Sequence, residues 1–113
     1  MEFGSHTVTH PILSRMDRAS VLQELRASKQ TIEQWTGTGV RVLSYPVGGP
    51  DGFNRMVQDT AAEIGYDLAV SYISGTNPMI AMDRYALRRI HVERYVHRAG
   101  FAAMLSAPEL FAR

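Results

Sequence analysis

Apolar positions recur at helical spacing in the first half of the chain. In residues 17–36, five apolar side chains fall near one face at a period of 3.6 residues, which predicts a helix. Asp17 suits its N-cap, and Gly37 suits the position just past its C-terminal end. A similar stripe predicts a second helix over residues 53–64, and residues 99–105 predict a last one. The stripe of the first helix consists of Val21, Leu22, Leu25, Ile32 and Trp35.

Runs rich in β-formers alternate with these helices. Residues 40–44, 67–73 and 85–92 predict three short strands, and loops containing glycine and proline follow the first two. Strands separated by helices of this length pair in parallel through right-handed crossovers. The pattern therefore predicts the α/β class, either an open sheet or a piece of a barrel, in a single domain over residues 1–113.

The composition is that of an ordinary globular domain. The chain has 113 residues, 45% of them hydrophobic, and 12 Lys/Arg against 11 Asp/Glu give a net charge of +1. A net charge this small creates no strong electrostatic field that would attract nucleic acid. The arginines within residues 84–98 indicate a solvated, ion-paired face rather than a nucleic-acid surface. No apolar run is long enough for a membrane span. Because the chain has no cysteine, a metal would have to be bound by His, Asp or Glu.

His6 and His10 are the first candidates for chemistry. Two imidazoles four residues apart can converge on one metal ion if the segment makes a helical turn, and neutral imidazole is a common zinc ligand. Thr7 stands where the zincin pattern needs a glutamate, so metalloprotease chemistry of that kind is not supported. The alternative is two surface or hydrogen-bonding histidines near a terminus.

Four stretches of the chain together resemble one known family. Residues 3–11 contain the histidine pair and lead into a helix, and residues 43–48 are similar to a loop that lines a substrate groove. Residues 62–70 resemble a passage from helix to strand, and residues 87–92 resemble a late Leu-x-Arg-Ile segment. The family is that of the polysaccharide deacetylases, the NodB-homology group or carbohydrate esterase family 4. The resemblance covers nearly the whole chain and implies parallel β/α units of a partial, distorted (β/α) barrel.

The resemblance also implies a metal-dependent hydrolase that removes acetyl groups from an acetylated carbohydrate. In this family pattern, His6 and His10 bind a divalent metal, usually zinc, and an aspartate is the third ligand. The backbone N–H of Val47 donates to the oxyanion of the reaction. A late histidine protonates the leaving amine, and His91 is the candidate for that general acid. The alternative for His91 is a strand histidine without a chemical role.

The groove loop supplies the implied substrate contacts. Tyr45, Pro46 and Val47 lie at the substrate-binding positions, and Val47 replaces an aromatic residue of the family. The implied partner is an acetylated polysaccharide or oligosaccharide, with no nucleic acid and no membrane span. The implied location is the cell envelope or the outside of the cell. An exposed sheet edge would favour a homo-oligomer.

The two catalytic aspartates of the family have no counterpart in this sequence. They lie in a Thr-Phe-Asp-Asp type motif before the histidines, whereas no two aspartates of this chain are adjacent. We therefore expect the chain to represent the later portion of a deacetylase domain and to be inactive by itself. One alternative is a non-catalytic or truncated deacetylase-like fold that needs a partner chain. Another is a flavodoxin-like module that binds a phosphorylated ligand at the glycine-rich loop, residues 48–54.

Overall fold

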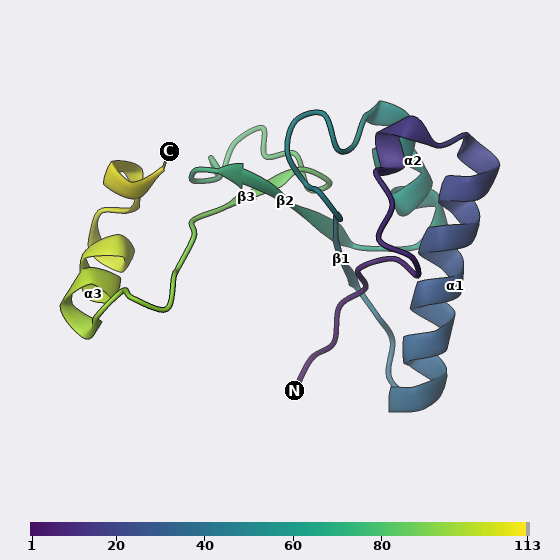
Figure 1. Cartoon of the computed structure of the whole chain (residues 1–113), viewed down its shortest axis with the longest axis horizontal. Helices are drawn as coiled ribbons and strands as arrows, with labels where there is room; N and C mark the ends of the chain where they lie inside the picture. The colour runs from purple at the N-terminus through teal and green to yellow at the C-terminus, as the bar shows by residue number, and fades with distance from the viewer. Residues whose placement is uncertain (113) are drawn as a thin grey trace.

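The computed structural model describes residues 1–112, which form an open sheet of three parallel strands with two packed helices beside it (Figure 1). The strands lie in the order β1 (Val42–Ser44), β2 (Leu68–Ser74) and β3 (Leu87–Arg89). α1 (Arg18–Thr36) and α2 (Arg55–Ile64) pack against each other, and α2 also contacts β2. The predicted α/β class and parallel pairing are confirmed. Of the two predicted alternatives, an open sheet and a piece of a barrel, the described residues form an open sheet, since three strands are too few to close a barrel.

Local signals set both ends of α1. The Asp17 carboxylate accepts a hydrogen bond from the Ser20 N–H at 2.8 Å, and Gly37 ends the helix with a φ of +70°. Of the predicted apolar stripe, Val21 and Leu25 are buried in the core and Ile32 packs against it, but Trp35 is 83% exposed. Its assignment to the buried stripe is therefore wrong, because the last turn of α1 extends past the core.

Capping residues likewise define α2. The side chain of Asn54 accepts a hydrogen bond from the Val57 N–H at 3.1 Å, and Gly65 ends the helix with a φ of +101°. The helix begins two residues later than the predicted residue 53, because residue 54 is the N-cap. Both helices and the strands β1 and β2 contribute to one core. Its buried hydrophobic members are Leu13, Val21, Leu25, Val40, Leu43, Tyr45, Val57, Ala61, Tyr66 and Ala69.

The N-terminal segment extends the sheet beyond β1. Ser5 forms a parallel bridge there: its N–H donates to the Val42 carbonyl and its carbonyl accepts from the Ser44 N–H, both at 2.8 Å. The hydroxyl of Ser5 is hydrogen-bonded to that of Ser28 in α1 at 2.8 Å, and both residues are buried. The residue immediately before His6 is thus held between the sheet and a helix.

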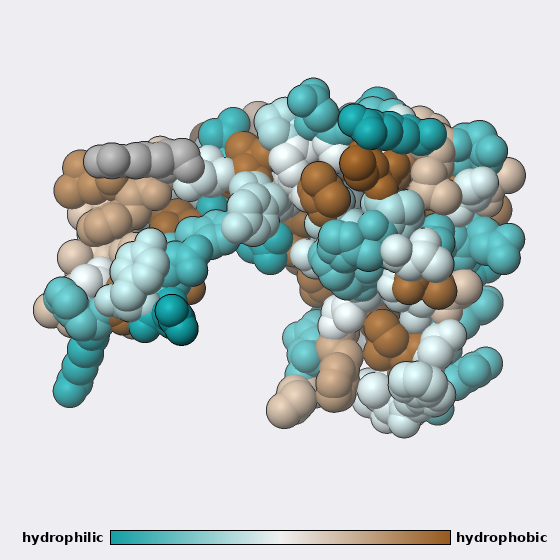
Figure 2. Space-filling model, in the orientation of Figure 1, coloured by the Kyte–Doolittle hydropathy of each residue, from teal (hydrophilic) through white to brown (hydrophobic). Residues whose placement is uncertain are grey.

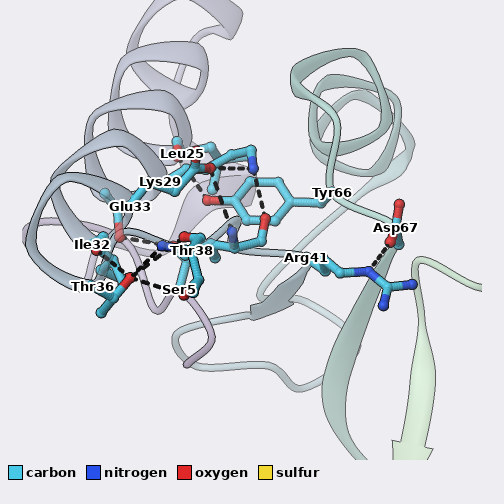
Figure 3. A network of polar contacts seen from close by, with 12 residues as sticks. Ser5, Leu25, Lys29, Ile32, Glu33, Thr36, Thr38, Arg41, Tyr66 and Asp67 are labelled. Carbon is cyan, nitrogen blue, oxygen red and sulfur yellow. Dashed lines mark hydrogen bonds and ion pairs between the residues drawn. The ribbon is translucent and has the colours of Figure 1, made fainter. Parts of the chain in front are cut away.

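A polar network joins α1 to the sheet and is drawn in Figure 3. The hydroxyl of Tyr66, a fully buried residue, donates to the Leu25 carbonyl at 2.8 Å, and burial raises the pKa of Tyr66 to about 12. Lys29 pairs with Glu33 one turn along α1 and donates to the Val40 carbonyl at 2.6 Å. These bonds satisfy polar groups that would otherwise be left unpaired beside the core.

The C-terminal part of the chain projects from this body. α3 (Arg98–Ser106) packs mainly against the short 3-10 helix η2 (Pro108–Phe111), and neither has a buried residue. Figures 1 and 2 show the pair standing apart from the sheet and α1. His97 is the N-cap of α3, since its ring accepts a hydrogen bond from the Gly100 N–H at 3.1 Å. Within residues 1–112, no helix combines the length and the hydropathy that crossing a membrane requires.

Candidate functional site

His6 and His10 lie at the ends of a tight, non-helical turn. Two residues of this turn, Thr7 and His10, have φ values of +65° and +58°, which are strained for residues other than glycine. The rings therefore come together through an irregular loop, and the helical turn that we expected such convergence to require is not formed. The two imidazole centroids are 4.9 Å apart, in an edge-to-face arrangement.

A backbone carbonyl orients the first imidazole. Nδ1 of His6 is 2.8 Å from the Ser44 carbonyl oxygen at the end of β1. Because a carbonyl only accepts, this bond requires the proton on Nδ1, and Nε2 is then the lone-pair nitrogen. Metal-binding histidines commonly have this arrangement, in which the second ring nitrogen donates to a carbonyl.

Glu24 of α1 holds the histidine turn in place. Its carboxylate accepts hydrogen bonds from the Val8 N–H at 2.8 Å, the Thr9 N–H at 3.0 Å and the Thr9 hydroxyl at 2.6 Å. Partial burial raises the pKa of Glu24, but these three hydrogen bonds outweigh it and leave the pKa below its usual value. The sequence pattern did not single out this role, because the contact joins residues 15 and 16 positions apart.

The loop after β1 forms another part of the wall of the site. Tyr45 is buried, stacks on Phe53 with 4.4 Å between ring centroids, and donates its hydroxyl to the Tyr85 carbonyl at 2.7 Å. Burial raises the pKa of Tyr45 above its ordinary value. Pro46 is buried as well, whereas Val47 is 53% exposed. Of the three predicted substrate contacts, Val47 is thus the most accessible.

Val47 is held in an unusual backbone conformation. Its φ is +47°, an outlier for a β-branched residue. The next residue, Gly48, accepts a hydrogen bond at its carbonyl from the Tyr72 N–H at 2.7 Å, which ties the loop to β2. Within residues 1–112, the N–H of Val47 has no hydrogen-bond acceptor. This N–H is therefore free to donate to a ligand.

These elements line one open cavity of about 780 Å³, a size typical of small-molecule sites. The structure brings the predicted residues His6, His10 and Val47 together at this cavity. It also adds Tyr72 from β2 and Arg89 from β3, which sequence analysis missed. The cavity is lined by His6, His10, Ser44, Tyr45, Val47, Gly48, Gly49, Tyr72 and Arg89.

His91 lies next to this cavity and not in it. Its Nε2 contacts the hydroxyl of Tyr72, and the two rings meet edge to face with 4.2 Å between centroids. The same nitrogen is 3.9 Å from a carboxylate oxygen of Glu93. Because Tyr72 lines both the cavity and a smaller hollow around His91, the tyrosine connects this histidine to the site.

The histidine pair fits part of a metal site. Two imidazoles face one cavity, and the nitrogen that His6 would use for a metal is the one left free by Ser44. Among residues 1–112, no group of three or more His, Cys, Asp or Glu side chains is arranged to hold a metal ion. A third ligand would therefore have to be water, substrate or a group from outside these residues.

The comparison with protein families identifies the chain. Residues 1–69 match the polysaccharide deacetylase model. The matched region contains the histidine turn, both packed helices, β1 and the loop with Val47. The chain therefore belongs to the polysaccharide deacetylase family. This membership favours the deacetylase hypothesis over a flavodoxin-like module.

Solved bacterial deacetylases share the fold. The Streptococcus pyogenes deacetylase PplD, solved in complex with acetate, superimposes with a TM-score of 0.79 at 23% identity, over 88% of this chain and 42% of that chain. A polysaccharide deacetylase from Bacillus cereus matches with a TM-score of 0.75 at 22% identity, over 88% of this chain and 30% of that chain. The chain thus spans less than half the length of these structures. No curated protein matches the chain.

Proposed function

We propose that this chain supplies the histidine pair and the oxyanion donor of a metal-dependent deacetylase site that acts on acetylated carbohydrate. Family membership supports the class of reaction. The observation that carries the proposal is the convergence of His6, His10 and the free N–H of Val47 on one cavity.

The chemistry divides among these residues. His6 and His10 would hold a divalent metal, with zinc as the best match to two imidazoles. Such a metal, when bound, polarises a carbonyl and lowers the pKa of bound water. The N–H of Val47 donates to the oxygen on which negative charge develops during attack on the acetyl carbonyl.

His91 is the proposed general acid. In the structure its ring is connected to the cavity through the hydroxyl of Tyr72. A proton held by the imidazole can therefore pass to a leaving amine either directly, after a rotation of His91, or through the tyrosine hydroxyl. The exposed position of the ring permits such a rotation.

The substrate and setting follow from the same proposal. An acetylated polysaccharide or oligosaccharide is the proposed partner, and the cell envelope or the outside of the cell is the proposed location. The sheet is open, so its edges offer unpaired backbone groups to a second copy of the chain. By itself the chain is proposed to have little activity, because residues 1–112 provide no carboxylate beside the two histidines to act as a base.

Zinc titration tests the metal assignment. Calorimetry of the chain should show one weak zinc site, and His6→Ala or His10→Ala should abolish it. His97→Asn is the matched control, since His97 lies on the remote α3 and asparagine preserves its cap. Equal zinc binding by wild type and the His6→Ala variant would refute the site. Nanomolar affinity of the wild-type chain for zinc would refute the claim that residues 1–112 provide an incomplete set of metal ligands.

Acetate release tests the predicted inactivity. The wild-type chain should release no measurable acetate from an acetylated oligosaccharide, with or without added zinc. Robust release that disappears in His6→Ala would show that the described residues suffice for catalysis, and would refute this part of the proposal.

A further inference from the structure

The cavity beside the histidines has an unbalanced charge. Arg89 lines it, and none of the other lining residues is an aspartate or a glutamate. Within residues 1–112, the ion pairs engage other cations and leave the guanidinium of Arg89 without a carboxylate partner. A fixed positive charge that lines a cavity in this way is complementary to an anionic group of a ligand.

Arg89 is held in position by contacts that leave part of its guanidinium free. Its Nε donates to the carbonyl of Ser71, a buried residue of β2, at 2.7 Å. The guanidinium carbon is 6.0 Å from the centroid of the Tyr72 ring. The two terminal nitrogens make no hydrogen bond within the described part of the chain. A guanidinium fixed in this way presents a fork that matches the geometry of a carboxylate.

We propose that Arg89 is the carboxylate-binding residue of this cavity and that the substrate is an acetylated polysaccharide with acidic sugars. The inference rests on the proposed function, because it assigns the substrate class of the same site. Two sources could supply a carboxylate: an acidic sugar or the acetate that deacetylation releases. The volume of about 780 Å³ favours the sugar, since acetate would occupy only a small part of it.

The neighbouring arginine provides a matched control. Arg88 precedes Arg89 in β3 and does not line the cavity. Its side chain packs beside Gly75, where an added Cβ would lie 2.9 Å from the Arg88 Cδ. Successive residues of a strand face opposite sides of the sheet, so the two positions differ in direction but not in charge.

The test is carboxylate binding to the metal-free chain in the presence of EDTA. Titrations with glucuronate, acetate and neutral glucose are followed by NMR chemical shifts. Glucuronate should bind to wild type, and Arg89→Gln should weaken this binding about tenfold or more, since it removes a charge-assisted bidentate contact. Arg89→Lys should give an intermediate loss, whereas Arg88→Gln should bind as wild type does. Circular dichroism checks that each variant is folded.

Several results would overturn the inference. These are equal glucuronate binding by wild type and Arg89→Gln, equal binding of glucose and glucuronate, and no binding of either carboxylate. Stronger binding of acetate than of glucuronate would indicate that Arg89 binds the acetate product, and it would contradict the proposal that the substrate contains acidic sugars. Because EDTA removes metal, the failure of the zinc titration and the failure of this experiment are independent outcomes.

Discussion

Glu24 offers a direct test of how the histidine turn is held. One carboxylate accepts three hydrogen bonds from two residues that lie between His6 and His10. Glu24→Ala removes all three and leaves the N–H groups of Val8 and Thr9 without their partner. Glu24→Gln preserves the shape and one acceptor oxygen but removes the charge. The pair of variants thus separates the charge from the geometry.

The magnitude follows from the number and exposure of these bonds. A hydrogen bond to a charged group contributes about 1.5–3 kcal/mol when its partners are buried. Water can replace the carboxylate at this partly exposed site, so we expect Glu24→Ala to lower the free energy of unfolding by about 2 kcal/mol in total. For a domain of this size, that corresponds to a decrease in Tm of roughly 8 °C. Glu24→Gln should lower the free energy of unfolding by about half as much.

The effect should depend on pH with a defined sign. The hydrogen bonds hold the pKa of Glu24 below its usual value in the folded chain. The stabilisation is therefore present above the unfolded pKa of about 4.3 and is lost as the pH falls through the folded pKa. The difference in Tm between wild type and Glu24→Ala should accordingly be constant near neutral pH and should decrease below about pH 4.

Thermal unfolding followed by circular dichroism measures these differences. Glu63→Ala is the matched control, because Glu63 makes an exposed ion pair with Arg18 that contributes about 1 kcal/mol at most. If the pair His6 and His10 binds zinc as proposed, Glu24→Ala should also weaken zinc binding about tenfold, as loss of outer-shell contacts does. An unchanged Tm for Glu24→Ala at pH 7 would refute the reasoning.

Two further predictions concern the loop and the core. Gly52→Ala should lower the free energy of unfolding, measured by chemical denaturation, by about 1–3 kcal/mol, because a Cβ there would lie 1.6 Å from the Val47 carbonyl oxygen. Gly49→Ala is the control, since a Cβ there meets nothing within 4 Å, and equal stability of the two variants would contradict the loop geometry. Burial raises the pKa of Tyr66 to about 12, so the neutral side chain stabilises the folded chain. This stabilisation is complete below the unfolded pKa of about 10 and is lost as the pH rises through about 12. The Tm should therefore decrease over this interval, and by less in Tyr66→Phe; an identical alkaline decrease in that variant would exclude Tyr66 as a cause.

Much of the secondary structure could be predicted because its causes are local. Asp17 and Gly37 bound α1, and Gly65 ends α2, as their cap positions indicate. Such residues act on backbone groups within one turn, so their effect hardly depends on the rest of the chain. The strand over residues 85–92 was predicted less well, since β3 spans only Leu87–Arg89. Where a strand ends depends on its neighbour, and the register of β3 with β2 is irregular.

The sequence by itself determined the family, the alternation of strands and helices, and the candidacy of His6 and His10. Only the tertiary structure decided what surrounds that pair. Arg89 and Tyr72 line the cavity because parallel strands end at the same edge of the sheet, a proximity that no spacing along the chain records. Trp35 is exposed for a related reason, since periodicity indicates a face and only the packed partner determines how far along the helix that face is buried.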